Sequence, residues 1–180
     1  NSQGALLTRV SYASATGSVT VDLAAHTATG DSSVGTDQLL GSGFATVIGS
    51  AGDDHLSGSS NAAGTVEIFD GRGGNDTIDG RGGFDRADYA FTPAGTGGIS
   101  VNLALGTVTG AAGNDTLISI ESIRGTNDND TFVTGNGFSG SNGTFNEFTG
   151  MGGNDSITGN GNTRLAFVNA TGGVTVDLQT

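Results

Sequence analysis

The sequence contains no cysteine, no tryptophan, no lysine and only one proline in 180 residues. Without cysteine there is no disulfide framework, a composition that suits the cytosol and equally a bacterial secreted protein stabilised in another way. Long apolar runs are also missing. No segment approaches the length needed to cross a membrane, so we expect no membrane insertion.

Positive charge is scarce as well, because six arginines are set against 18 acidic residues and the net charge is −12. Leu, Ile, Val and Phe make up only about a fifth of the chain. Like charges and a modest apolar content both oppose compaction, so a folded chain needs something that offsets the repulsion. Divalent cations are the natural candidates. The acidic balance argues against nucleic acid or an anionic membrane as partner.

Glycine is abundant, with 34 copies, and it marks a nine-residue repeat. Gly71–Asp79 and Gly80–Asp88 are two such units back to back. Each has glycine at positions 1, 3 and 4, aspartate at position 6 and an apolar residue at position 8. The glycines favour a tight turn over the first six residues, and the last three alternate as in a very short strand. One unit cannot bury a core, so we expect the units to stack.

These units resemble the nonapeptide of the RTX (repeats-in-toxin) calcium-binding proteins. The resemblance implies an all-β fold, a right-handed parallel β-roll or β-solenoid in which two nonapeptides form one coil. It also implies that Ca²⁺ lies between stacked Gly/Asp-rich turns, bound by aspartates and turn carbonyls. The expected partners are therefore calcium ions and neighbouring repeats of the same chain. Calcium accepts six to eight oxygen ligands in flexible geometry, which such turns can supply.

A longer repeat is superimposed on the nonapeptides. Val19–Leu23 recurs as Ile99–Leu103 and again as Val174–Leu178, each an alternation of apolar and polar residues that predicts a half-buried strand. Residues 1–180 are therefore expected to form one continuous β-solenoid segment of about two and a third units of about 77 residues. The first calcium-repeat block is expected at 35–88 and the second at 110–167.

Alternation of turns between two edges predicts where the metal lies. One edge is expected to carry the turns of six aspartates, Asp37, Asp54, Asp76, Asp115, Asp130 and Asp155. The opposite edge receives expanded or degenerate segments and is expected to be largely metal-free, with Asp85, its only aspartate at position 6, as its expected metal ligand. The resemblance implies further ligands at Asp128 and at Gly49, Gly52, Gly71, Gly74, Gly110, Gly113, Gly125, Gly150 and Gly153.

No Gly-x-Ser-x-Gly, His-Glu-x-x-His or Walker motif occurs, so we expect no enzyme activity. The favoured interpretation is a calcium-binding structural β-roll segment of a large secreted or surface-attached bacterial protein. It would fold on binding calcium in the extracellular space, after the type I export that the resemblance implies. One alternative is a non-catalytic calcium module of a secreted enzyme or toxin. Another is a surface- or ice-binding adhesin segment, although the pairs Thr27/Thr29 and Thr107/Thr109 are too few and irregular for a lattice-matched array.

Overall fold

The computed structural model describes residues 8–41, 43–61, 65–170 and 173, and within them the chain forms strands and no helix. The all-β prediction is therefore confirmed. The third copy of the longer repeat, Val174–Leu178, lies outside the described residues.

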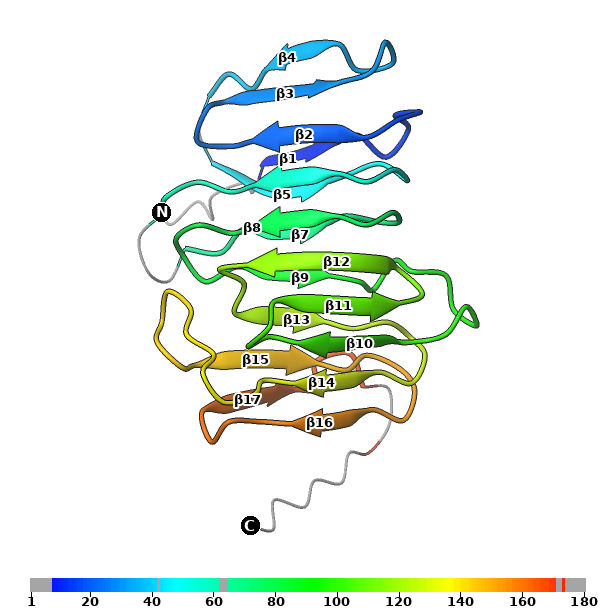
Figure 1. The fold of residues 1–180 in the computed structure, drawn as a ribbon, viewed down its shortest axis with the longest axis vertical. Helices are drawn as coiled ribbons and strands as arrows, with labels where there is room; N and C mark the ends of the chain where they lie inside the picture. The colour runs from blue at the N-terminus through cyan, green and yellow to red at the C-terminus, as the bar shows by residue number, and fades with distance from the viewer. Residues whose placement is uncertain (1–7, 42, 62–64, 171–172, 174–180) are drawn as a thin grey trace.

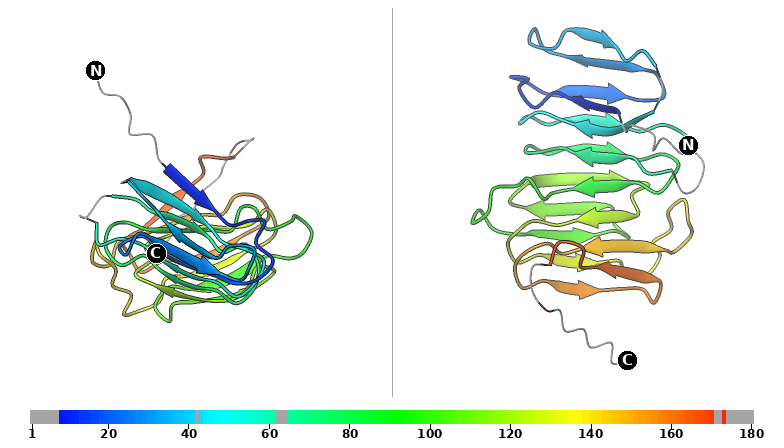
Figure 2. Two further views of the ribbon diagram at one scale, coloured as in Figure 1. Left: turned by 90° about the horizontal axis from the view of Figure 1, so that it is seen from above. Right: turned by 180° about the vertical axis from the view of Figure 1, so that it is seen from behind.

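The strands form two sheets that face each other along one long axis (Figures 1 and 2). The seven-stranded sheet has the order β1 (Thr8–Ser11), β5 (Phe44–Ile48), β7 (Ile68–Asp70), β9 (Arg86–Asp88), β13 (Ser122–Arg124), β15 (Asn146–Thr149), β17 (Thr163–Ala166). The ten-stranded sheet has the order β16 (Ser156–Thr158), β14 (Thr131–Val133), β10 (Ile99–Asn102), β11 (Thr107–Gly110), β12 (Gly113–Ile118), β8 (Thr77–Asp79), β6 (His55–Ser57), β2 (Val19–Asp22), β3 (Thr27–Gly30), β4 (Thr36–Gln38).

Between β5 and β9 the chain alternates between the two sheets, so that each pair of strands completes one coil. Successive coils pair in parallel, with Leu56 beside Ile78 in one sheet and Phe69 beside Ala87 in the other. Each of these strands is only three residues long because its single central side chain points inward and the flanking residues return to the turns. This arrangement confirms the parallel β-roll.

Two antiparallel excursions interrupt the roll. In the ten-stranded sheet, β2, β3 and β4 form one meander, and β10, β11 and β12 form its equivalent about one long repeat later. The segment from Gly110 to Asp115 was expected to be a nonapeptide turn between the two edges. It is instead a hairpin connection within one sheet, where Gly110 pairs with Gly113 and both have positive φ. Antiparallel strands can be joined by such a short loop.

The core is a narrow double row of inward side chains, one from most strands. The fully buried members include Val21, Val47, Leu56, Phe69, Ile78, Ala87, Ile123, Phe132 and Phe148. Phe132 from β14 stacks on Phe148 from β15, with ring centroids 5.0 Å apart. Because so few side chains separate the sheets, each large one contributes heavily to stability.

We expect Phe132→Ala to lower the free energy of unfolding by about 3–5 kcal/mol, because it removes a stacked ring and leaves a cavity between the sheets. Urea denaturation in saturating calcium measures the change. The matched control is Phe91→Ala, since Phe91 is 72% exposed, and its effect should stay within about 0.5 kcal/mol. Equal effects of the two substitutions would contradict this account of the core.

Candidate metal centre

The turns that join the two sheets line two edges of the roll. The first edge comprises the turns that lead from the seven-stranded to the ten-stranded sheet, residues 49–54, 71–76, 125–130 and 150–155. The second edge comprises the turns that lead back from the ten-stranded to the seven-stranded sheet. Among them are residues 58–61 with 65–67, 80–85, 119–121 and 134–145. The structure thus places Asp54, Asp76, Asp130 and Asp155 on one edge and Asp85 on the other, as the spacing predicted.

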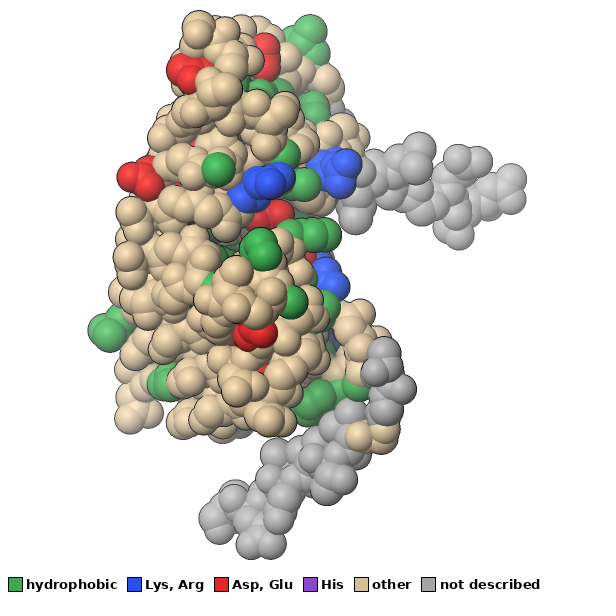
Figure 3. Space-filling model, turned by 90° about the vertical axis from the view of Figure 1, so that its right-hand side faces the viewer, with side chains coloured by type: hydrophobic (Ala, Val, Ile, Leu, Met, Phe, Trp, Pro, Cys, Tyr) green, Lys and Arg blue, Asp and Glu red, His purple; other side chains and the backbone are tan. Residues whose placement is uncertain are grey.

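Aspartates of the first edge form a ladder in which each carboxylate reaches the backbone of its neighbour. Oδ1 of Asp76 accepts the Asp54 N–H at 2.8 Å, and Oδ1 of Asp115 accepts the Asp76 N–H at 2.9 Å. Further along, Oδ1 of Asp155 accepts the Asp130 N–H at 3.0 Å. Apart from Asp155, these side chains are almost fully buried. Figure 3, which faces this edge, accordingly shows isolated acidic side chains and no continuous acidic patch.

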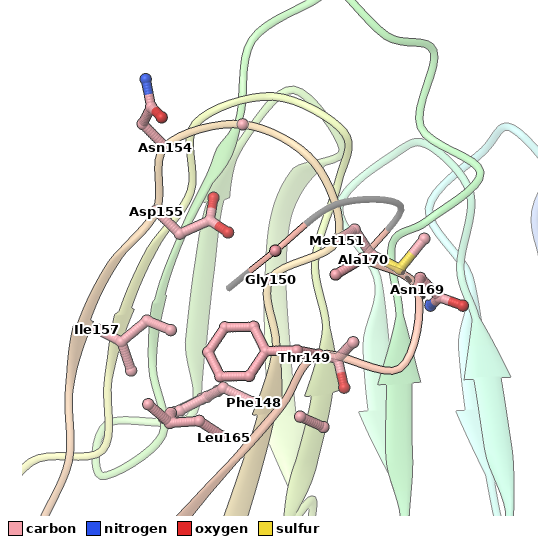
Figure 4. Close-up of a pocket in the computed structure, with 14 residues that line it drawn as sticks. Phe148, Thr149, Gly150, Met151, Asn154, Asp155, Ile157, Leu165, Asn169 and Ala170 are labelled. Carbon is pink, nitrogen blue, oxygen red and sulfur yellow. Dashed lines mark hydrogen bonds between the residues drawn. The ribbon is translucent and has the colours of Figure 1, made fainter. Parts of the chain in front are cut away.

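Glycine at position 1 lets the carboxylate fold beneath its own turn. A Cβ added at Gly71 or Gly150 would overlap Oδ2 of Asp76 or Asp155, and the same holds for Gly49 and Gly125 with their aspartates. Figure 4 shows the Asp155 side chain directed toward Gly150 under the arch of the turn. The glycines at position 4 stack on one another, because a Cβ at Gly74 would strike the Gly52 backbone and one at Gly113 the Gly74 carbonyl. Position 1 therefore serves the carboxylate and position 4 serves the stacking of coils.

Three of the expected ligands have other partners. Asp37 lies in the outermost strand β4 and accepts a hydrogen bond from the Tyr12 hydroxyl at 3.0 Å. Asp115 accepts an equivalent bond from Tyr89 at 2.9 Å. The carboxylate of Asp128, which occupies a position where glycine is usual, accepts the N–H groups of Gly95 and Gly97 and so fastens the loop before β10.

The second edge also carries a ladder of buried acids, which the sequence reasoning missed. Asp85 Oδ1 accepts the Glu67 N–H at 3.0 Å, and Glu121 Oε2 accepts the Asp85 N–H at 2.9 Å. Glu67 and Glu121 lie two residues before the inward Phe69 and Ile123, as Asp85 lies two residues before Ala87. Counting back from the inward residue of each strand, instead of searching for aspartate, would have found them.

On each edge there is an acid with a carboxylate oxygen that accepts no hydrogen bond from the described residues, as Asp85 and Asp76 show. Oδ2 of Asp85 is fully buried and has no hydrogen-bond partner among the described residues. For Asp76, no described residue donates to Oδ2, whereas Oδ1 accepts the Asp54 N–H. A buried carboxylate oxygen without a donor is costly unless a proton or a cation reaches it. The residues present therefore fit a hard cation such as calcium.

Burial raises the pKa of Asp76 to about 8 and the pKa of Asp85 to about 8, because the charged form loses its hydration. Neighbouring carboxylates raise both pKa values further, while backbone N–H donors lower them in part. Burial likewise raises the pKa of Asp115, Asp130 and Asp155. Without metal, protons are thus the ions that these ladders attract.

Carboxylates alone do not complete a calcium shell here. In the part of the chain that the structure describes, no three Asp, Glu or His side chains converge on one point. An ion in these turns would therefore take one or two carboxylate oxygens and complete its six to eight ligands with turn carbonyls and water.

The raised pKa values predict how the metal-free chain responds to pH. A carboxyl whose pKa rises from 3.8 to about 8 on folding favours the folded state in acid, and this contribution is lost as pH rises toward 8. We therefore expect more β-structure at about pH 5 than at about pH 8 in calcium-free buffer, measured by circular dichroism. The double variant Asp76→Asn/Asp85→Asn should flatten the profile. A β-signal that grows with pH would contradict the assignment.

Comparison with known families agrees with this geometry. The family model described as RTX calcium-binding nonapeptide repeat (4 copies) matches residues 40–62, 68–87 and 141–163, which include the turns of Asp54, Asp76, Asp85 and Asp155. A search of curated proteins found no match. Within the described residues, no helix is long and apolar enough to cross a membrane. These three segments match the RTX calcium-binding nonapeptide repeat, and the fold that contains them is the parallel β-roll that this calcium-binding repeat implies.

Proposed function

We propose that this chain is a structural segment of a larger bacterial protein that is secreted or attached to the cell surface, and that it folds when it meets extracellular calcium. It acts as a rigid spacer or presenting stalk and performs no catalysis. The non-catalytic calcium module of a secreted enzyme or toxin would have the same physical properties. The two possibilities differ in what the chain is joined to.

The observation that carries the proposal is the pair of buried carboxylate ladders. Together they place seven acids inside the turns of a chain whose net charge is already −12: Asp54, Glu67, Asp76, Asp85, Asp115, Glu121 and Asp130. Burying ionised carboxylates in series is unfavourable at neutral pH unless hydrogen-bond donors or cations compensate them. Calcium binding free energy then becomes folding free energy. A cytoplasm poor in calcium would keep the chain unfolded for export.

The positions of the acids suit a role in holding the turns together better than a role in catalysis. Those of both ladders bond to the backbone of an adjacent turn, which fixes them in the stack. A cavity of about 620 Å³ lies at the end of the roll and has an apolar floor of Phe148, Ile157 and Leu165 (Figure 4). It has no pair of acids that could serve as general acid and base.

A row of threonines supports a second candidate, adhesion to a regular surface such as ice. Paired positions run without a break across seven adjacent strands of the ten-stranded sheet and point outward, in the order Thr36, Thr29, Thr20, His55, Thr77, Thr116 and Thr107. Neighbouring strands lie roughly 4.8 Å apart, so the row has a fixed spacing. It is more regular than the isolated threonine pairs in the sequence indicated.

The calcium-coupled proposal predicts that the chain is largely unfolded in chelator at neutral pH and becomes β-rich on titration with calcium. The midpoint is expected in the extracellular range of roughly 10⁻⁴–10⁻³ M. Circular dichroism follows the transition. Magnesium is the matched control and should act weakly, because it requires near-octahedral geometry and retains its water ligands. A full β-spectrum in chelator at neutral pH would contradict coupled folding.

The adhesion candidate predicts that the calcium-loaded chain inhibits ice recrystallisation. Thr77→Lys/Thr116→Lys should abolish the inhibition, because the long charged side chains break the flat row at its centre. The control is Thr131→Lys, which lies outside this row on β14 and should leave the inhibition intact. Absence of inhibition by the unmodified chain would exclude ice as the target.

A further inference from the structure

Six of the acids that end the turns fall into two groups according to what their own turn donates to them. In the turn Gly49–Asp54, Ser50 donates twice to the Asp54 carboxylate, from its N–H at 2.6 Å and from its hydroxyl at 2.7 Å. In the turn Gly125–Asp130, Thr126 does the same for Asp130, at 2.8 Å for each bond. A serine or threonine at position 2 thus gives each carboxylate oxygen a hydrogen-bond donor within the turn, one from its N–H and one from its hydroxyl.

The second edge contains the same device with a longer acid. Ser59, which follows Gly58, donates its N–H to Glu67 Oε2 at 2.9 Å and its hydroxyl to Oε1 at 2.6 Å. We call these three turns, Gly49–Asp54, Gly58–Glu67 and Gly125–Asp130, the closed turns. Their carboxylates have donors for both oxygens from one residue, so they need no additional cation.

The other three turns, Gly71–Asp76, Gly80–Asp85 and Gly150–Asp155, are the open turns. Their position 2 holds Arg72, Arg81 or Met151, all with positive φ, in the left-handed region that the serines and threonine of the closed turns avoid. This conformation turns the position-2 N–H away from the acid. The N–H groups of Arg72 and Arg81 instead bond to Asp70 and Asp79, at 2.9 Å each.

An open turn therefore withdraws both donors that a closed turn supplies. Oδ1 of Asp76, Asp85 and Asp155 retains one bond, from the N–H of the adjacent coil's acid. No described residue donates to Oδ2 of any of the three. The left-handed backbone at position 2 is unfavourable for residues other than glycine, so it persists only if something at the turn compensates.

Asp85 shows most directly what the compensating partner is. Its side chain is fully buried, and Oδ2 has no partner among the described residues. A Cβ added at Gly80 would touch both this oxygen and the Ser119 carbonyl oxygen. Two oxygens thus flank the same small space with no hydrogen donor between them. Hard cations with oxygen ligands occupy such spaces.

The open turns also share one place in the stack. Each lies against a closed turn, because the carbonyls of Gly71, Gly80 and Gly150 would meet a Cβ added at Gly49, Gly58 and Gly125, respectively. Each open turn thus packs against a closed turn, in which a hydroxyl of the same turn already donates to the carboxylate.

We propose that calcium in this chain is assigned by the residue at position 2. The open turns of Asp76, Asp85 and Asp155 bind the ions, whereas Ser50, Ser59 and Thr126 replace calcium in the closed turns of Asp54, Glu67 and Asp130. One of these calcium sites, at Asp85, then lies on the second edge, which is otherwise expected to be largely metal-free. This assignment rests on the proposed calcium-dependent fold.

The test counts bound calcium by isothermal titration and equilibrium dialysis on the whole chain and four variants. Asp76→Asn and Asp85→Asn should each lose one bound ion per chain. Their matched controls are the neighbouring acids of the same ladders, Asp54→Asn and Glu67→Gln, which should retain the full number. Loss of an ion in either control would overturn the assignment but leave calcium binding intact. Absence of calcium binding by the unmodified chain would instead overturn the proposed function.

A crystal structure of the unmodified chain grown in calcium needs no variant to fold. Anomalous scattering should place ions beside Asp76, Asp85 and Asp155 and none in the turns closed by Ser50, Ser59 and Thr126. Ions in the closed turns, or an empty turn at Asp85, would overturn the proposal.

Discussion

The structure depends on one hydrogen bond that is repeated from coil to coil, in which the acid at each strand entry accepts the N–H of the acid in the adjacent coil. Because donor and acceptor occupy the same position of the repeat, a shift of one residue would break the bond and turn the strand inside out. Asp54, Asp76 and Asp115 remain in register although the spacing between them varies widely. Insertions are therefore accommodated in the loops, where they do not disturb the ladder.

The same bond creates the electrostatic problem that calcium solves. A carboxylate buried under a turn loses its hydration, and each neighbour in the ladder adds a like charge. This chain compensates its acids in several ways: hydrogen bonds from hydroxyls in the closed turns, hydrogen bonds from tyrosine hydroxyls at Asp37 and Asp115, and a space for a cation or proton at Asp85. The first two are permanent, whereas the last depends on the surrounding solution. The stability of the fold therefore has one contribution from the hydroxyl hydrogen bonds, which is always present, and another that depends on the calcium concentration and pH of the solution.

The fold class could be predicted from the sequence because each recurring residue type of the nonapeptide corresponds to one requirement of the folded coil. Glycine at position 1 leaves room for the carboxylate under the turn, and glycine at position 4 allows the coils to stack closely. The apolar residue at position 8 is the single side chain that each strand contributes to the core. The assignment of the clean turns to two edges followed from spacing alone, and Asp76 and Asp85 indeed lie on opposite edges.

Other features were hidden because different residues can occupy the same structural position. Glu67 and Glu121 take the place of aspartate but lie in expanded segments that no longer resemble the repeat. The segment from Gly110 to Asp115 has the letters of a nonapeptide, yet it forms a hairpin, because β11 already lies in the same sheet and a two-residue connection suffices. In both cases the local sequence underdetermined the structure, and the pairing partner decided it.

The ladders also divide the first edge into two blocks. On the first edge, one block runs from the Val19 N–H through Asp54 and Asp76 to Asp115, and the next begins again at the Ile99 N–H with Asp130. Strand β11 separates the two blocks, because it lies between β12 of the first block and β10 of the second. The equivalent strand β3 lies next to β2, where the first block begins.

On the second edge the ladder is not interrupted at this point, since β9 and β13 pair directly and Asp85 bonds to Glu121 across the boundary. The two edges therefore have different tasks. The first edge divides the chain into blocks, each with its own short series of acids, whereas the second edge joins one block to the next. Because Asp85 is the acid nearest that junction, neutralising its buried oxygen stabilises the contact between blocks as well as a single turn.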